Sequence, residues 1–348
     1  MPEGHSVHRL ARQFGDVFAG ERLAVSSPQG RFAQGAALLD GHTLVSSVAH
    51  GKHLFLEFGH GLLLHVHLGL YGAWDFGGDA TFRGASSIGA PRKVGEREIY
   101  DDGGEAGPAR YEGPPAPVGA VRVRIASAHG WADLRGATTC ETITEAEAAG
   151  PASYEGPPAP VGAVRVRLAG AHGWADLRGA TTCEAITDAE AAAVLARLGP
   201  DPLRNLPGDR DAFSATVAAK RTPLAALLMD QKVIAGVGNV YRAELLFRQR
   251  LNPWLPGAEL SPDAARRLWD DTAAMMTDGV RDGRIITTPP QYWNGAGAGV
   301  SRGVLPAPEE AHFVYRRHGL GCRDCGTPVA LTELGARKLY WCPACQQA

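Results

Sequence analysis

Apolar residues near the start of the chain recur at the spacing of one helical face, and a glycine follows them. These positions are Val7, Leu10, Ala11, Phe14, Val17, Phe18 and Gly20. From residue 44 to residue 76 the pattern changes to short runs rich in valine, leucine and phenylalanine, with Gly59-His60-Gly61 as a turn. The sequence therefore predicts an N-terminal helix followed by antiparallel sheet.

The C-terminal half has a helical pattern that begins after the two prolines of Gly199-Pro200-Asp201-Pro202. Thr222-Pro223 predicts a cap and a first-turn proline for one helix. A second helix is expected at 239–250, capped by its asparagine, and a third at 261–283, opened by Ser-Pro and ended by glycine. These helices predict a second domain, and the prolines mark its boundary.

A long segment of the chain occurs twice. Residues 111–149 recur at 154–192 with 35 of 39 positions identical. Structural repeats that stack usually come in three or more copies. Two copies therefore indicate a tandem duplication inside one domain, or an error in the recorded sequence.

Composition bounds the class of protein. At about 150 residues per domain, 348 residues suggest two domains, or a large one and a small module. With 45% hydrophobic and 21% charged residues, a wholly disordered, collagen-like or coiled-coil chain is excluded. No apolar run approaches the roughly 18 residues of a spanning helix, and the start lacks a secretion signal, so a cytoplasmic protein is expected.

The net charge of −2 hides an asymmetry between the two halves. Residues 1–202 carry 17 basic and 23 acidic side chains, whereas residues 203–348 carry 18 basic and 14 acidic ones. A local basic face matters more for binding nucleic acid than the total charge does. Composition therefore permits a DNA partner without indicating one.

Four cysteines form two Cys-x-x-Cys pairs near the end of the chain, with 16 residues between the pairs. They are Cys322, Cys325, Cys342 and Cys345. Two such turns joined by a hairpin-length span predict a tetrahedral site for one structural zinc ion. Four thiolates leave no open position, so the metal is not expected to be catalytic.

A glycine-rich segment, 231–239, lies between two of the predicted helices. Its glycines let the backbone approach a ligand, and the N–H groups at the next helix start favour an anion such as phosphate. Taken alone, the segment is more typical of a simple helix-to-helix turn.

Four motifs occur together in one order along the chain: Met1-Pro2-Glu3-Gly4, the run 65–72 (HVHLGLYG), the segment 227–241 and the cysteine pairs. In this order they resemble the formamidopyrimidine-DNA glycosylase/endonuclease VIII family, and most of all the actinobacterial endonuclease VIII branch. The resemblance implies an α+β fold: an N-terminal helix with a β-sandwich, then a helix-two-turns-helix domain with a zinc-bearing β-hairpin. It places these parts at 1–198, 199–311 (with a base-lid loop) and 312–348.

The resemblance implies that four residues carry the chemistry. Removal of Met1 would expose the secondary amine of Pro2, the family's nucleophile, which attacks the sugar C1′ and forms a Schiff base. Glu3 matches the proton donor, a role that needs a raised pKa. Lys52 matches the lysine that contacts the lesion's phosphate, and Arg337 the arginine that grips phosphates and assists the second elimination.

Four further residues are expected to bind DNA. Leu70 and Tyr71 match the wedge that fills the gap left by the extruded nucleotide, although Tyr71 fits the sandwich core equally well. Asn239 matches the asparagine that binds phosphate, a role compatible with helix capping. Arg178 lies where the family has an arginine that probes the opposite base.

The family has one copy of the duplicated segment, so its sandwich has one slot for the two strands that each copy predicts. One copy is expected to fill it while the other is looped out, joins an edge or stays poorly ordered. A hybrid of the two copies is an alternative. An added exposed edge would favour aggregation.

The function expected is a bifunctional DNA glycosylase/AP lyase of base excision repair that removes oxidised bases, with pyrimidines favoured, and cleaves the strand by β,δ-elimination. The partner is double-stranded DNA with oxidised bases or abasic sites, and the enzyme is expected to be a monomer in the cytoplasm, at the nucleoid, without an organic cofactor. Two alternatives remain: a glycosylase for oxidised purines such as 8-oxoguanine, and a non-catalytic DNA-binding protein whose pocket the duplication spoils.

Overall fold

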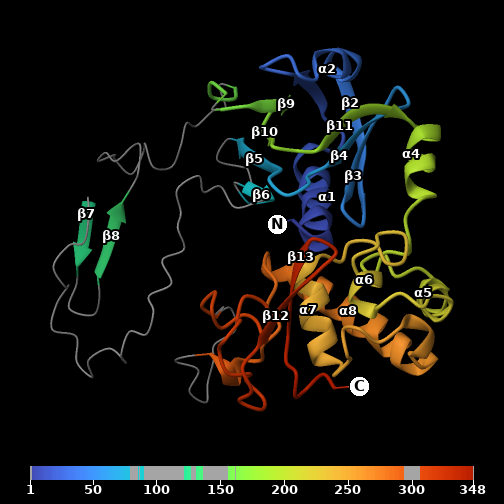
Figure 1. Ribbon diagram of the computed structural model, residues 1–348. Helices are drawn as coiled ribbons and strands as arrows, with labels where there is room; N and C mark the ends of the chain where they lie inside the picture. The colour runs from blue at the N-terminus through green and yellow to red at the C-terminus, as the bar shows by residue number, and fades with distance from the viewer. Residues whose placement is uncertain are drawn as a thin grey trace. The chain divides into compact units, whose positions relative to one another are not determined.

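The computed structural model divides the chain into two compact units, Met1–Pro91 with Tyr154–Ala348, and Arg92–Ser153. The structure describes residues 2–78, 85, 87–89, 121–126, 131–135, 156–160, 162–293 and 306–347. Strands β7 (Val121–Ala126) and β8 (Trp131–Arg135) are the described part of the smaller unit (Figure 1). Part of the expected lid loop, 294–305, and most of the first repeat copy lie outside the described residues.

The predicted N-terminal helix is confirmed as α1 (Gly4–Phe18). Its apolar face is buried against β2 (His42–His50) and β3 (His53–Phe58), and its first turn meets α8 (Pro262–Asp282). The helix therefore connects the sheet with the helical half.

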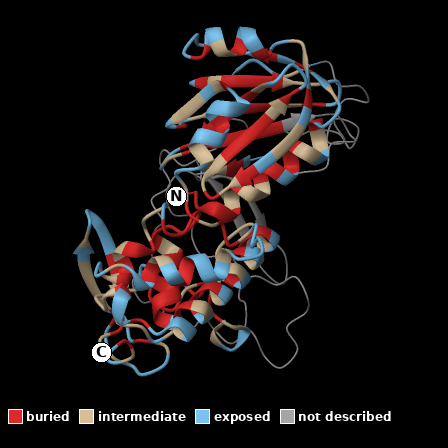
Figure 2. Cartoon of the chain, turned by 90° about the vertical axis from the view of Figure 1, so that its right-hand side faces the viewer, coloured by how far each residue is buried: buried red, intermediate tan, exposed pale blue. Residues whose placement is uncertain are grey.

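The predicted antiparallel sheet is also confirmed. Nine described strands run in the order β11-β4-β3-β2-β1-β9-β10-β5-β6. The remaining strands are β1 (Arg22–Ser26), β4 (Leu62–His67), β5 (Ala73–Gly78), β6 (Ser87–Gly89), β9 (Val164–Ala169), β10 (Gly173–Arg178) and β11 (Thr182–Thr187). Strand β1 joins two halves of the sheet by pairing with β2 and β9. The two halves share one core with α1, in which Phe14, Leu56, Trp74 and Val166 are fully buried (Figure 2).

The second copy of the repeat supplies β9, β10 and β11, whereas β7 and β8 of the first copy pair only with each other among the described strands. One copy thus fills the slot, and the described strands form neither a hybrid nor an added edge. The registers match: Asp176 faces Arg167 in the second copy as Asp133 faces Arg124 in the first. The repeated unit therefore forms the same hairpin twice.

The sequence just beyond the repeat explains why the second copy is the one in the sheet. Helix α4 (Asp188–Leu195) begins at the end of this copy, with a capping box between Thr187 and Glu190. Its Ala191 packs with Phe55 of β3. The first copy is followed instead by Gly150-Pro151, which cannot continue a helix. Among the described residues, the second copy therefore adds a helix that covers this part of the sheet.

Two deletions test whether the copies are interchangeable. Removing residues 111–153 or residues 150–192 leaves chains of equal length that differ at only four repeat positions. One of these four differences lies in the buried core, where one copy has leucine and the other has isoleucine. Such an exchange usually lowers the free energy of unfolding by less than about 1.5 kcal/mol. Both chains are expected to unfold within about 5 °C of the full chain by calorimetry. A loss of cooperative unfolding in the chain lacking 111–153 would show that the first copy supports the fold.

The second half of the larger unit is helical, as predicted, and ends in a hairpin. Its elements are α5 (Asp209–Ala218), α6 (Leu224–Leu227), α7 (Asn239–Arg248), α8, the short helices η1 (Gly257–Glu259) and η2 (Pro290–Tyr292), and strands β12 (Ala330–Leu334) and β13 (Arg337–Trp341). The expected caps of α8 are confirmed, with Ser261 accepting from the Ala264 N–H and Gly283 left-handed. No helix in the described part of the chain combines the length and apolarity needed to cross a bilayer.

The prediction that Asn239 caps α7 is wrong. The N-cap residue is Gly238, and the Asn239 side chain makes no capping hydrogen bond. The N–H groups at the start of α7 instead donate to the carboxylate of Glu3, near the other end of the chain.

Candidate active site

Pro2 and Glu3 lie buried at the start of α1, against the start of α7. The Glu3 carboxylate accepts hydrogen bonds from the backbone N–H groups of Gly238 at 2.8 Å, Val240 at 2.9 Å and Tyr241 at 3.4 Å. The first N–H groups of a helix lack partners within the helix and attract negative charge. Glu3 therefore caps α7 across more than two hundred residues of sequence.

The surroundings of Glu3 act on its pKa in opposite directions. Burial raises the pKa above 4.5, while the nearby Lys52 charge and the three backbone hydrogen bonds lower it, and burial outweighs them. Desolvation penalises the charged form of a carboxyl group. Glu3 consequently holds its proton to a higher pH than an exposed glutamate does, as a proton donor must.

Three glycines allow three segments distant in sequence to meet. The Gly4 N–H donates to the Gly236 carbonyl at 2.8 Å. A Cβ on Gly51 would lie 2.7 Å from the Ala235 Cβ, and a Cβ on Gly236 would lie 2.9 Å from Met276 Cε. Gly51 and Gly236 also have positive φ angles of 57° and 92°. Side chains at these positions would separate the start of α1, the β2–β3 turn and the loop before α7.

Lys52 reaches the same loop from the β2–β3 turn. Its Nζ donates to the Val237 carbonyl at 2.7 Å, and Gln231 Nε2 donates to the same oxygen at 3.0 Å. Burial lowers the pKa of Lys52, the Glu3 carboxylate opposes this shift, and the Arg337 guanidinium adds to it. The structure therefore brings Glu3, Lys52 and Arg337 within electrostatic range of one another.

Asn239 links α7 to the C-terminal hairpin. Its Nδ2 donates to the Lys338 carbonyl at 2.9 Å, and its Oδ1 accepts a hydrogen bond from Arg242. Arg242, itself fully buried, also donates to the Lys338 carbonyl at 3.1 Å. Lys338 follows Arg337, which is exposed at the start of β13, so these contacts fix the hairpin near the Glu3–Lys52 site.

The expected wedge residues are on the surface and not in the sandwich core. Leu70 is 40% exposed and Tyr71 78% exposed, in the loop between β4 and β5. A hydrogen bond from the Gly72 N–H to the Leu68 carbonyl closes this loop. A Cβ on Gly179 would lie 2.5 Å from the Tyr71 carbonyl, so the turn after β10 packs against the loop between β4 and β5. Exposed apolar side chains on a braced loop are available to a partner.

Arg178 lies at the end of β10, beside this loop. Its guanidinium donates to the Asp75 carboxylate and, at 3.2 Å, to Asp176. Asp176 is fully buried and forms a two-point pair with Arg167 at 2.7 and 2.8 Å. In this structure the Arg178 side chain belongs to that ionic network within the sheet.

The four predicted metal ligands converge. The sulfur atoms of Cys322, Cys325, Cys342 and Cys345 all lie within 4.8 Å of one another. Two of the sulfur–sulfur distances are 3.9 Å (Cys322 to Cys345) and 3.5 Å (Cys325 to Cys342). A tetrahedron with metal–sulfur bonds of about 2.3 Å has sulfur–sulfur edges of about 3.8 Å. These residues therefore fit a four-thiolate metal site.

Several buried polar residues in and around the site belong to none of the motifs found in the sequence. Arg242 and Glu244 are buried and polar inside α7, and Glu244 accepts from the backbone of Phe313, Val314 and Tyr315 at 2.7 to 2.9 Å. Asp201 stands between two prolines of the connection between α4 and α5, where nothing in the sequence distinguishes it from a linker residue. Charged residues within an otherwise apolar helix could have pointed to the first two.

The raised pKa of Glu3 predicts a pH-dependent cost to stability. The folded carboxyl group holds its proton more tightly than the unfolded one, so stability declines as pH rises above 4.5 towards the folded pKa. Each unit by which the pKa of the folded state exceeds that of the unfolded state lowers the free energy of unfolding by about 1.4 kcal/mol. Urea unfolding at pH 4.5 and pH 8 should show wild type losing stability relative to Glu3→Gln. An equal difference at both pH values would mean that Glu3 titrates normally.

Comparison with known proteins gives matches over most of the chain. The family model for the formamidopyrimidine-DNA glycosylase N-terminal domain matches residues 1–127, and the one for the formamidopyrimidine-DNA glycosylase H2TH domain matches residues 198–290. Endonuclease 8 1 of Mycobacterium tuberculosis is 38% identical over 346 residues, covering 99% of this chain and 100% of that protein. Formamidopyrimidine-DNA glycosylase of Thermus thermophilus is 37% identical over 157 residues, which cover 44% of this chain and 55% of that protein.

Solved structures agree on the fold. MutM (Fpg) from Thermus thermophilus superposes with a TM-score of 0.61 at 22% identity, over 99% of this chain and 98% of that one. Lactococcus lactis Fpg in complex with abasic-site DNA superposes with a TM-score of 0.63 at 16% identity, over 99% of this chain and 100% of that one. The α+β architecture predicted from the sequence is thereby confirmed.

The fold, the site and these similarities define the class of protein as a DNA glycosylase with AP lyase activity, acting in base excision repair. The matches over the full chain decide the family. The chain belongs to the formamidopyrimidine-DNA glycosylase/endonuclease VIII family.

Proposed function

We propose that this protein removes oxidised bases through a Schiff base on Pro2 and then cleaves the strand by β,δ-elimination. The observation that carries the proposal is the position of Glu3, buried beside Pro2 with its carboxylate on the start of α7. A proton donor with a raised pKa next to a terminal secondary amine suits this chemistry.

The proposed reaction begins when the Pro2 nitrogen forms a bond to the sugar C1′ and the bond from C1′ to the base breaks. Glu3 supplies the proton that the departing base accepts. The Pro2 nitrogen then loses its proton and the C1′–O4′ bond of the sugar breaks, with a proton taken up by O4′. Because proline is a secondary amine, the resulting C1′ iminium carries a positive charge, and it draws electrons from the sugar. Loss of the C2′ proton then expels the 3′ phosphate, and a second elimination expels the 5′ phosphate.

Lys52 and Arg337 are proposed to bind the phosphates that flank the lesion. Lys52 Nζ is held at the Val237 carbonyl, and Arg337 is exposed at the hairpin tip. Asn239 is placed to contact the same backbone, since it lies at the start of α7. A guanidinium can bind phosphate oxygens in pairs, and a helix N-terminus attracts phosphate.

Leu70 and Tyr71 are proposed to enter the duplex when the damaged nucleotide is swung out. Extrusion costs a few kcal/mol of stacking and pairing, which inserted apolar or aromatic groups partly replace. The exposure of both side chains supports this role. Arg178 would contact the opposite base only after leaving Asp75 and Asp176. The substrate is double-stranded DNA, bound by a monomer at the bacterial nucleoid.

Oxidised pyrimidines are proposed as the preferred bases. Endonuclease 8 1 matches across the whole chain, whereas formamidopyrimidine-DNA glycosylase of Thermus thermophilus matches 44% of it. Competition between duplexes containing thymine glycol and duplexes containing 8-oxoguanine tests the preference. Faster excision of 8-oxoguanine would support a purine-directed enzyme instead. A non-catalytic role is disfavoured because β7 and β8 stay out of the nine-stranded sheet.

The four cysteines are proposed to hold one zinc ion that stabilises the C-terminal hairpin. Binding of a structural metal is coupled to folding, so its removal should unfold this part of the chain. Treatment with a chelator is expected to release one zinc per chain, measured by mass spectrometry of the metal, and to weaken DNA binding at least about tenfold. Release of a different metal, or unchanged DNA binding, would contradict the proposal.

A further inference from the structure

Asp201 is a buried carboxylate in the connection between α4 and α5, with 1% of its surface exposed. It accepts hydrogen bonds from His8 Nε2 of α1 at 2.6 Å, from the Gly51 N–H at 2.7 Å and from the Leu203 N–H at 2.9 Å. One oxygen, Oδ2, receives both the His8 and the Gly51 bonds. Asp201 therefore ties α1, the β2–β3 turn and the interdomain connection together.

The contacts of Asp201 favour its charged form. Burial raises the pKa of Asp201, but the hydrogen bond and charge of His8, with the N–H groups of Gly51 and Leu203, outweigh burial and hold the pKa below 3.8. A buried carboxylate with three donors is a rigid anchor, because losing any donor leaves charge unsatisfied.

This anchor acts on the peptide that precedes Lys52. Gly51 is held on one side by Asp201, and on the other it approaches Ala235 and Gly236 so closely that a Cβ would lie 2.7 and 2.9 Å from their atoms. The direction in which Lys52 leaves the turn is thereby set, and its Nζ meets the Val237 carbonyl. Asp201 bonds to the turn and to His8, His8 acts on the turn through Asp201, and neither side chain bonds to the Lys52 ammonium group.

We propose that His8 and Asp201 form a positioning pair that sets Lys52 for its part in strand cleavage. The proposal rests on the function proposed above, in which Lys52 binds the lesion's phosphate. Neither residue of the pair meets the substrate. Their effect passes through the Gly51 peptide, so removing either one lets the Lys52 ammonium move away from its place beside Glu3.

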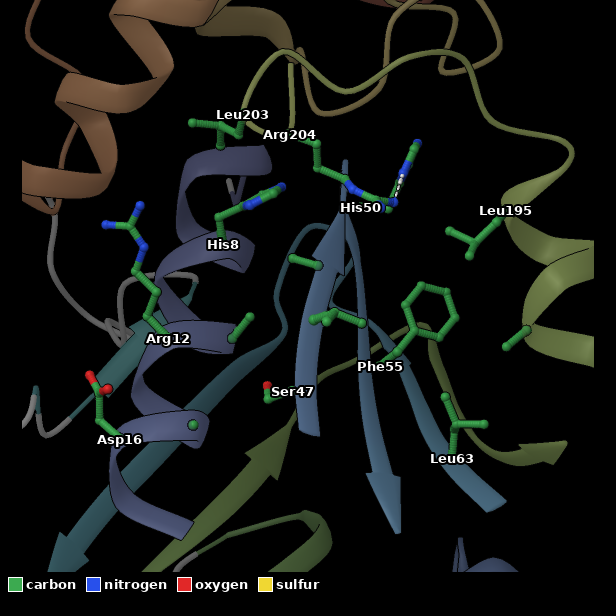
Figure 3. Close-up of a pocket in the computed structure, with 15 residues that line it drawn as sticks. His8, Arg12, Asp16, Ser47, His50, Phe55, Leu63, Leu195, Leu203 and Arg204 are labelled. Carbon is green, nitrogen blue, oxygen red and sulfur yellow. Dashed lines mark hydrogen bonds between the residues drawn. The ribbon is translucent and has the colours of Figure 1, made fainter. Parts of the chain in front are cut away.

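The packing around His8 tolerates a shorter side chain at this position. It lines a cavity of about 570 Å³ between α1, the strands β2 and β3 and α4, together with Arg12 one helical turn later (Figure 3). Shortening His8 therefore enlarges an existing cavity and opens none in the core. Arg12 is exposed on the same helix and has no described hydrogen bond or ion pair, which makes it a matched control.

A double-mutant cycle tests the pair. His8→Ala is expected to lower kcat for cleavage of abasic DNA about tenfold with KM changed less than threefold, while Lys52→Ala lowers kcat further. In the Lys52→Ala background, His8→Ala should then change kcat less than twofold, because residues that act through one group are not additive. Asp201→Asn should behave like His8→Ala.

Two further variants separate positioning from structure. His8→Gln, whose amide can still donate to Asp201, is expected to recover most of the activity, and Arg12→Ala to match wild type. Additive effects of His8→Ala and Lys52→Ala, or an equal loss in His8→Gln, would overturn the proposal. So would a Lys52→Ala variant as active as wild type. If wild type itself fails to cleave abasic DNA, the proposed function fails instead.

Discussion

Replacing Pro2 with glycine is expected to reduce the adduct that borohydride traps on abasic DNA by at least about 100-fold. The proline ring fixes the backbone of the nucleophile at the buried start of α1, and glycine releases it. A misplacement of about 1 Å can cost that much in rate. The adduct is measured as the fraction of labelled DNA that migrates with protein after reduction.

Mass spectrometry provides the control. The mature protein should lack Met1, and the trapped peptide should carry the sugar on its N-terminal proline. An adduct on a lysine, or full strand cleavage by a protein that keeps Met1, would exclude the Pro2 mechanism. Tight binding to abasic DNA without any adduct would instead support a non-catalytic protein.

Replacing Glu3 with glutamine is expected to lower excision of an oxidised base by about 10²- to 10⁴-fold, the usual contribution of a general acid. Cleavage of DNA that is already abasic should fall less than about tenfold, because no base has to be protonated there. Both rates are measured in single-turnover assays on matched duplexes.

The variant keeps an amide oxygen towards the N–H groups at the start of α7, so its thermal unfolding shows whether capping survives. If both rates fall together and the unfolding temperature also drops, the main role of Glu3 is to cap α7. Separation of the two rates at unchanged stability would identify it as the proton donor.

The fold could be predicted where the signals are local. The apolar spacing of α1 and the Ser-Pro and glycine ends of α8 lie within the elements that they define. The cap of α7 could not be predicted, since Glu3 supplies it from the opposite end of the chain. The choice between repeat copies likewise depended on residues after the repeat, namely Gly150-Pro151 against the continuing α4.

The sequence predicts residues for the candidate site but not their geometry. Pro2, Glu3 and Lys52 were found through motifs, while their surroundings come from segments far apart in sequence. Spacing alone cannot show that Gly4, Gly51 and Gly236 meet, or that Asp201 accepts from both His8 and Gly51. Spacing alone also cannot show whether Tyr71 is exposed, since an aromatic residue near a strand can pack in the core or act as a wedge at the surface.

The near identity of the two repeat copies has a consequence for the history of this gene. Among the described strands, β7 and β8 lie outside the nine-stranded sheet, so the core of that sheet constrains the second copy. A segment relieved of that constraint accumulates neutral changes, yet only four of 39 positions differ. This near identity is that of a recent duplication, or of an error in the recorded sequence.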